Sequence, residues 1–69
     1  MKFNYSKLLG RMKERGFTQE KLADCIRIAP TTLNAKLNNK GNFTTSEIAR
    51  ICKVLEISKD EIGVYFFAE

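Results

Sequence analysis

The side chains with the clearest chemical potential lie in a polar stretch between Arg27 and Phe43, which contains no acidic residue. After Pro30 this stretch combines hydroxyl, amide and methyl groups with two lysines, in the residues Thr31, Thr32, Asn34, Ala35, Lys36, Asn38 and Lys40. Compact side chains of this kind can enter a DNA major groove without repelling phosphate. Amides can pair with adenine, and methyl groups can touch the methyl of thymine. The stretch therefore predicts a surface suited to contacting nucleic acid.

Catalytic and metal chemistry find little support in the same chain. There is no histidine, and the two cysteines, Cys25 and Cys52, are too few for a four-ligand zinc site. No Ser/His or Cys/His constellation and no phosphate-binding glycine loop is present. We therefore predict that the protein is not an enzyme and uses no metal, cofactor or small-molecule ligand. Both cysteines stand among apolar neighbours at helical spacing, so we expect them in the core as reduced thiols.

Helices must position the polar stretch, because apolar residues recur at three- and four-residue spacing along the chain. A first apolar stripe begins at Tyr5. Three further starts are predicted at Thr18, Thr44 and Ser58, each an N-cap flanked by a pair of apolar staple residues. Another is predicted at Pro30, whose missing N–H suits the first turn of a helix.

These starts divide residues 1–69 into five helices with short connections, which predicts one compact all-α domain. The second helix ends near Ile26 and the third begins at Pro30, so a helix-turn-helix is expected over about residues 18–38. Leu33 and Leu37 are predicted to face inward from the third helix, which leaves its polar side chains outside.

Charge is distributed unevenly along the chain. The total of 12 basic and 8 acidic residues gives +4, but residues 1–43 hold nine basic and three acidic side chains. Such a basic half suggests a face for a polyanion, and ordinary surface charge is the alternative. No export signal and no apolar run of about 20 residues is present, so we expect a cytoplasmic protein that does not contact a membrane.

The segment TQEKLADCIRIAPTTLNAKLNNK resembles the helix-turn-helix of Cro/CI-type phage and prophage repressors. The resemblance continues through NNKGNFTTSEIARICKVLEIS, which is similar to the loop and fourth helix of that family. It implies a lambda-repressor-like fold and a small, single-domain, Cro-like repressor that occludes a promoter. Two positions depart from the family pattern: Arg27 stands where glycine is usual in the turn, and Pro30 replaces a polar residue.

The resemblance also implies roles for individual residues. Base contacts would come from the start of the third helix, through Pro30, Thr31, Thr32, Asn34 and Ala35. Phosphate contacts would come from the residues around it, namely Gln19, Lys36, Asn38, Lys40 and Asn42. A solvated turn that only ends the helix is the alternative for residues 38–42.

The partner implied by the resemblance is double-stranded operator DNA, bound by a homodimer because one module of this size covers few base pairs. Tyr65 and Phe67 are candidates for the dimer surface, and a place in the core is the alternative for Tyr65. A different class of function stays open. The fold also permits a protein-interaction module, similar to an antirepressor, that binds another regulator rather than DNA.

Overall fold

The computed structural model describes residues 2–69, and within that range it contains five α-helices, one short 3-10 helix and no strand. The elements are α1 (Ser6–Glu14), α2 (Gln19–Ile26), α3 (Pro30–Leu37), α4 (Thr45–Leu55), the 3-10 helix η1 (Lys59–Glu61) and α5 (Ile62–Phe66). The expected all-α fold of five helices, with a helix-turn-helix at the second and third, is confirmed. Met1, the first residue of the expected 1–69 domain, lies outside the described residues.

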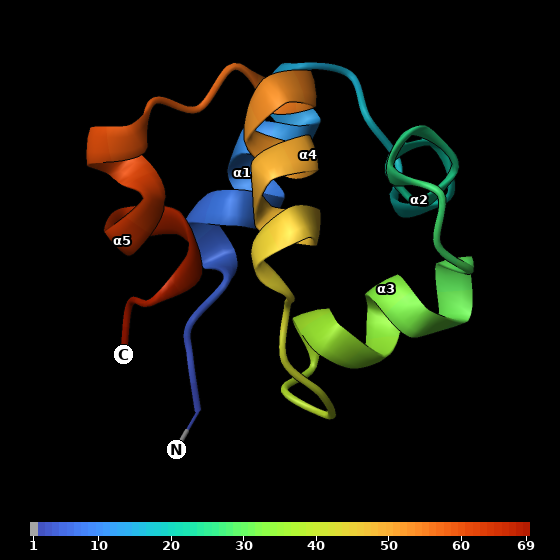
Figure 1. Cartoon of the computed structure of the whole chain (residues 1–69), viewed down its shortest axis with the longest axis horizontal. Helices are drawn as coiled ribbons and strands as arrows, with labels where there is room; N and C mark the ends of the chain where they lie inside the picture. Colours follow the sequence, from blue (N-terminus) through green and yellow to red (C-terminus); the bar gives the residue numbers. More distant parts are fainter. Residues whose placement is uncertain (1) are drawn as a thin grey trace.

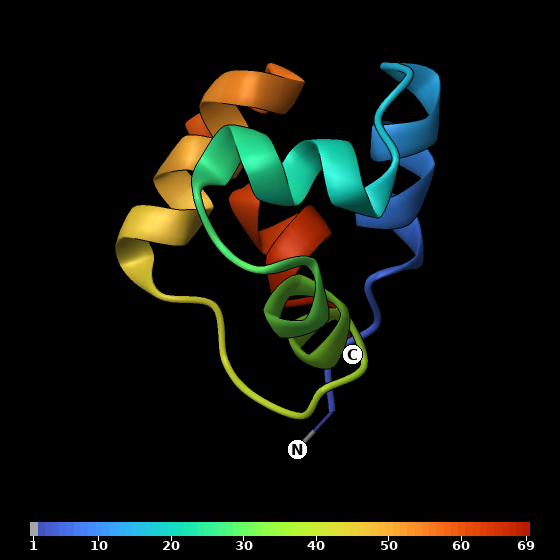
Figure 2. The same cartoon turned by 90° about the vertical axis from the view of Figure 1, so that its right-hand side faces the viewer.

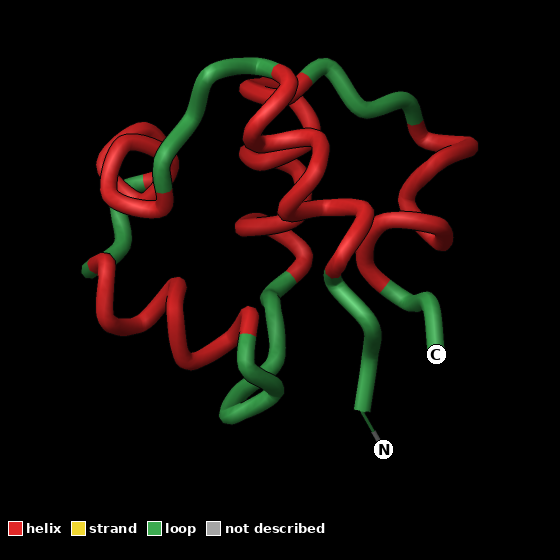
Figure 3. The backbone as a smooth tube through the Cα atoms, turned by 180° about the vertical axis from the view of Figure 1, so that it is seen from behind, coloured by secondary structure: helices red, strands yellow, loops and turns green. Residues whose placement is uncertain are grey.

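Helix α4 stands at the centre of the molecule, with α1 behind it (Figure 1). Helix α5 lies on one side of α4, whereas α2 and α3 lie on the other. Turning the molecule shows α2 from its side and α3 nearly end-on, so the two helices are strongly inclined to each other (Figure 2). The view from behind shows loops joining the helices over the surface and both ends of the chain on the same side (Figure 3).

Every α-helix contributes to one core. Its largest fully buried side chains are Leu8, Leu22, Ile26, Leu33, Ile51, Leu55 and Phe66. Each such burial contributes about 1.5–3 kcal/mol relative to exposure, so the core is the main source of stability. The expectation that both cysteines belong to the core is wrong for Cys25, which is exposed on α2, while Cys52 is half-buried. No helix in residues 2–69 combines the length and the apolar character needed to cross a membrane.

Local capping explains why the helices begin where they do. The Thr18 hydroxyl accepts the Lys21 N–H at 3.1 Å, and the Thr44 hydroxyl accepts the Glu47 N–H at 3.1 Å. Pro30 occupies the first turn of α3, as its fixed φ favours. The first helix starts one residue later than its apolar stripe suggests, because Tyr5 is the N-cap of α1 and not its first helical residue.

Candidate functional site

The outward side of α3 is the surface on which the predicted contact residues gather. We call it the α3 face and define it by the exposed residues Pro30, Thr31, Thr32, Asn34 and Asn38. Leu33 and Leu37 point the other way and are buried, as predicted from their spacing. Ala35, the fifth residue with a predicted base contact, is half-buried, whereas the other four are exposed. The α3 face therefore offers hydroxyl and amide groups but no charge.

The amides on this surface form a chain of hydrogen bonds. Asn34 Nδ2 donates to Gln19 Oε1 of α2 at 3.0 Å. Asn38 Nδ2 donates to the Asn34 carbonyl at 2.8 Å and to Asn34 Oδ1 at 3.2 Å. Both ends of the Asn34 amide are thus occupied within the protein. These bonds fix the orientation of the Asn34 amide and leave one N–H and one lone pair of it unpaired.

Lys36 points away from the α3 face and forms an ion pair with Glu47 of α4. Its Nζ lies 2.6 Å from Oε1 and 2.7 Å from Oε2, and the two side chains are only 15% and 11% exposed. The same carboxylate accepts the Thr44 N–H at 2.9 Å, which completes the capping box of α4. A phosphate contact by Lys36 would cost this ion pair and leave Glu47 without its cation.

The protonation of Glu47 follows from these contacts. Burial alone would raise the pKa of its carboxyl. The hydrogen bonds from Lys36 and Thr44, together with the charge of Lys36, outweigh burial and hold the pKa of Glu47 below its ordinary value. The carboxylate of Glu47 therefore stays ionised at physiological pH, and its ion pair with Lys36 ties α3 to α4.

The turn between α2 and α3 holds an arginine in a strained conformation. Arg27 has φ 62° and ψ 44°, in the left-handed region that glycine adopts at little cost. Its N–H bonds to the Ala23 and Asp24 carbonyls and so closes the end of α2. This is the turn position at which glycine is usual in the Cro/CI family, and it has a positive φ here. Ala29 and Pro30 then start α3 in a new direction.

The remaining predicted contact residues are scattered. Gln19 is half-buried and belongs to the amide chain, whereas Lys40 and Asn42 are exposed in the loop after α3. Asn42 lies beside a cluster of aromatic rings rather than beside the α3 face. Of the two candidates for a dimer surface, Phe67 is 51% exposed, whereas Tyr65 is half-buried against the core.

Two residues with structural roles were missed by the sequence analysis. Glu47 was not predicted as the partner of Lys36. Asn39 has φ 62° and holds the N-terminal segment: its amide accepts the Phe3 N–H and donates to the Phe3 carbonyl, both at 2.8 Å. An asparagine before a lysine and a glycine is a signal for a left-handed turn residue, but its distant partner has no local signal.

Taken together, this side of the molecule is polar and ordered by its own hydrogen bonds, and Lys36 of α3 is held in an ion pair. Specific DNA binding draws much of its affinity from lysine and arginine at phosphates. Within residues 2–69 there is also no group of three or more His, Cys, Asp or Glu side chains that could hold a metal ion. The arrangement suits hydrogen bonding to another macromolecule more than it suits acid-base or metal chemistry.

Comparison with known proteins gives a consistent answer over the whole chain. The family model described as "Protein of unknown function (DUF739)" matches residues 1–69. Among solved structures, the chain is similar to the solution structure of the modulator of repression (MOR) of the temperate bacteriophage TP901-1 from Lactococcus lactis. The identity is 36% and the TM-score 0.81, with 97% of this chain and 90% of that chain covered. No curated protein matches the chain.

These findings correct the identification as a Cro/CI-type repressor. The family match and the solved structure place the chain with a modulator of repression, so the expected function as a DNA-binding, promoter-occluding repressor is wrong. The expected partners, operator DNA and a homodimer bound to it, are corrected for the same reason. The physical cause is that caps, turn and apolar spacing specify the bend of a helix-turn-helix, whereas they do not specify what its outer surface contacts. The DNA contacts assigned to individual residues stay predictions of that resemblance.

Proposed function

The chain belongs to the DUF739 family, and we propose that it acts as an antirepressor-like module that binds another transcription regulator, a repressor protein, rather than operator DNA. The observation that carries this proposal is the 36% identity to a phage modulator of repression over 97% of the chain. A likeness of that extent, without large insertions on either side, supports a shared mode of action as well as a shared fold.

The chemistry of the helix-turn-helix supports a protein partner. Lys36, which stands on α3 itself, is neutralised by Glu47. The amides of Gln19, Asn34 and Asn38 bond to one another. A protein surface can be contacted without concentrated positive charge, whereas a phosphate backbone is bound mainly through it.

The proposed mechanism is competition by mass action. A repressor held by this module is removed from the pool that binds operators, so repression weakens as the module accumulates. The module itself performs no catalytic step. Because the regulators of phage genes act on DNA inside the cell, we place this function in the cytoplasm.

Titration calorimetry tests the proposal directly. The repressor encoded in the same genome as this chain is titrated with the purified protein, and a saturable complex with Kd of about 1 μM or tighter is expected. In a gel-shift assay at about 150 mM salt, where non-specific phosphate binding is suppressed, the chain should release the repressor from its operator without shifting the duplex alone. Tight binding of the chain to the operator, with no complex with the repressor, would contradict the proposal.

A further inference from the structure

The structure contains an apolar groove on the side of α4 opposite to α3. We call it the α4–α5 groove. It has a volume of about 360 Å³ and is lined by Thr45, Ile48, Ala49, Cys52 and Lys53 of α4, by Ile57 and Lys59 of the connection, and by Ile62 of α5. Figure 1 shows α5 on the side of α4 that faces away from α2 and α3. Helix α5 packs against α1 and η1 rather than closely along α4. This side of α4 is therefore not covered by a closely packed helix.

The two charged residues of the groove have the same sign. Lys53 and Lys59 are exposed, and within residues 2–69 neither has an ion-pair partner. The neighbouring carboxylates are engaged elsewhere or do not line the groove. Glu56 pairs with Arg15 at 2.6 Å, Glu61 accepts the Ser58 N–H, and Asp60 lies outside the lining. The groove therefore combines an apolar floor with two unpaired cations.

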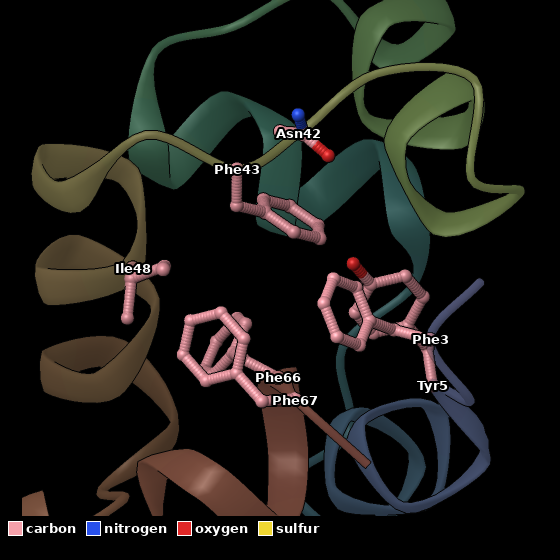
Figure 4. A pocket seen from close by; sticks show the side chains of 7 residues that line it. All are labelled: Phe3, Tyr5, Asn42, Phe43, Ile48, Phe66 and Phe67. Atoms are coloured by element: carbon pink, nitrogen blue, oxygen red, sulfur yellow. The ribbon is translucent and has the colours of Figure 1, made fainter. Parts of the chain in front are cut away.

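A second hollow extends this surface past Ile48, which lines both. It has a volume of about 200 Å³, and its other lining residues are Phe3, Tyr5, Asn42, Phe43, Phe66 and Phe67. Figure 4 shows their side chains around a common space. The rings pack edge to face, with centroids 5.5 Å apart for Phe3 and Phe67 and 5.6 Å for Phe43 and Phe66. Phe67 is half-exposed at this hollow, so an apolar side chain could enter beside it.

We propose that the α4–α5 groove is the surface that receives the repressor, and that its occupant is an amphipathic helix whose apolar stripe is flanked by Asp or Glu. This inference rests on the proposed function. An amphipathic helix laid into an apolar groove is a recurrent mode of protein recognition. The apolar stripe covers Ala49, Cys52 and Ile57, an apolar anchor enters the aromatic hollow, and the carboxylates meet Lys53 and Lys59.

Charge selects this occupant over a second copy of the chain. The chain carries a net charge of +4, so two copies repel each other. An acidic helix gains from Lys53 and Lys59, mainly in its rate of association and in specificity.

The first experiment uses the unaltered protein and its two cysteines. Cys52 lines the groove and Cys25 is exposed on α2, outside the groove, so each reports on a different surface. The probe is a synthetic amphipathic helix of about 15 residues, a length at which isolated helices begin to be stable, with a leucine stripe and flanking glutamates. Burial raises the pKa of the Cys52 thiol, which lowers the fraction of reactive thiolate. The alkylation rate of each cysteine is therefore compared with its own rate in the absence of peptide.

The glutamate peptide should slow alkylation of Cys52 about tenfold and leave Cys25 unchanged, and the repressor should do the same. A peptide with lysines in place of the glutamates should protect neither cysteine. Failure of both the glutamate peptide and a bound repressor to protect Cys52 would overturn the inference. Protection of Cys52 in concentrated protein alone, together with a dimeric mass, would identify a second copy as the occupant and overturn it as well.

A pair of double variants tests the role of charge. Lys53→Glu with Lys59→Glu should weaken repressor binding about tenfold. Lys7→Glu with Lys13→Glu, two exposed lysines of α1 away from the groove, changes the net charge equally and should alter binding by about twofold or less. Equal losses in the two double variants would overturn the inference.

Ala49→Trp, which fills the groove without changing charge, should also weaken binding at least about tenfold.

These measurements separate the two proposals. If the unaltered protein does not bind the repressor, the proposed function fails, and the peptide experiment still decides whether the groove takes an acidic helix. If the repressor binds while Cys52 stays reactive and both groove variants bind normally, the proposed function stands and the groove inference fails.

Discussion

The α3 face and the α4–α5 groove lie on opposite sides of α4, and their polar groups are used differently. On the α3 side, Asn34 bonds to Gln19 and Asn38, and Lys36 is paired with Glu47. At the groove, Lys53 and Lys59 stand free beside half-buried apolar side chains. Residue type alone would rank the α3 face as the better binding surface. Pairing reverses that order for the lysines, because Lys36 must give up its ion pair to bind a partner, whereas within residues 2–69 Lys53 and Lys59 have no ion pair to lose.

The largest expected effect concerns the ion pair that lies between the two regions. Glu47→Ala should lower the free energy of unfolding by about 3 kcal/mol, because Lys36 would keep a poorly solvated charge and α4 would lose its capping box. Glu61→Ala is the matched control, since it removes a capping carboxylate that is exposed and has no cation. Its cost should be about 1 kcal/mol or less. Chemical denaturation measures both, and equal costs would show that the ion pair adds nothing to the cap.

Acid should remove the same stabilisation without any mutation. The pKa of Glu47 is lower in the folded protein than its ordinary value. Its contribution is therefore fully present above the unfolded pKa of roughly 4.3 and is lost as the pH falls through the lower folded pKa. Between about pH 5 and pH 2, the unfolding free energy of the unaltered protein should fall more steeply than that of Glu47→Gln. Parallel curves for the two proteins would mean that this carboxyl is not coupled to folding.

The helices themselves follow from local sequence. The caps at Thr18 and Thr44, the first-turn position of Pro30 and the inward leucines of α3 all lie where short-range rules put them. Even the positive φ at Arg27 follows from its place after α2. These features depend on residues within one or two turns of one another, so the sequence contains the necessary information.

Local sequence does not determine which side chains are free to contact a partner. Lys36 meets Glu47 because the loop after α3 brings α4 back against it, and Asn39 reaches Phe3 across 36 positions. The groove was missed for a related reason. Ile48 and Cys52 share an apolar stripe with Ile51 and Leu55, but only the latter two are fully buried. Periodicity identifies the apolar side of a helix, whereas tertiary packing decides how much of that side is covered.

A smaller effect is expected on the α3 face. Asn34→Ala should cost about 1 kcal/mol of stability, because it removes exposed hydrogen bonds to Gln19 and from the Asn38 side chain. It should change the affinity for the repressor by about twofold or less, compared with about tenfold for Ala49→Trp in the groove. Calorimetric titration of both variants tests the contrast. A tenfold loss with Asn34→Ala and none with Ala49→Trp would transfer the docking surface to the α3 face.

The smallest expected effect has the opposite sign. Arg27→Gly relieves a left-handed conformation that costs an L-residue about 1–2 kcal/mol. Glycine in turn destabilises the fold by about 0.5–1 kcal/mol, because it loses more conformational entropy on folding. The net result should be a stabilisation of about 0.5 kcal/mol, since within residues 2–69 the Arg27 side chain makes no hydrogen bond or ion pair that would be lost.

Glu56→Gly is the matched control for this last change, because Glu56 also has a positive φ but its carboxylate pairs with Arg15. Loss of that exposed ion pair should offset the relief of strain and leave stability nearly unchanged. Thermal unfolding distinguishes the two variants. Arg27→Gly also removes a cation from the turn before α3, so a repressor that docks in the α4–α5 groove should bind this variant with unaltered affinity. A clear loss of binding with Arg27→Gly would show that the helix-turn-helix side of α4 takes part in the complex.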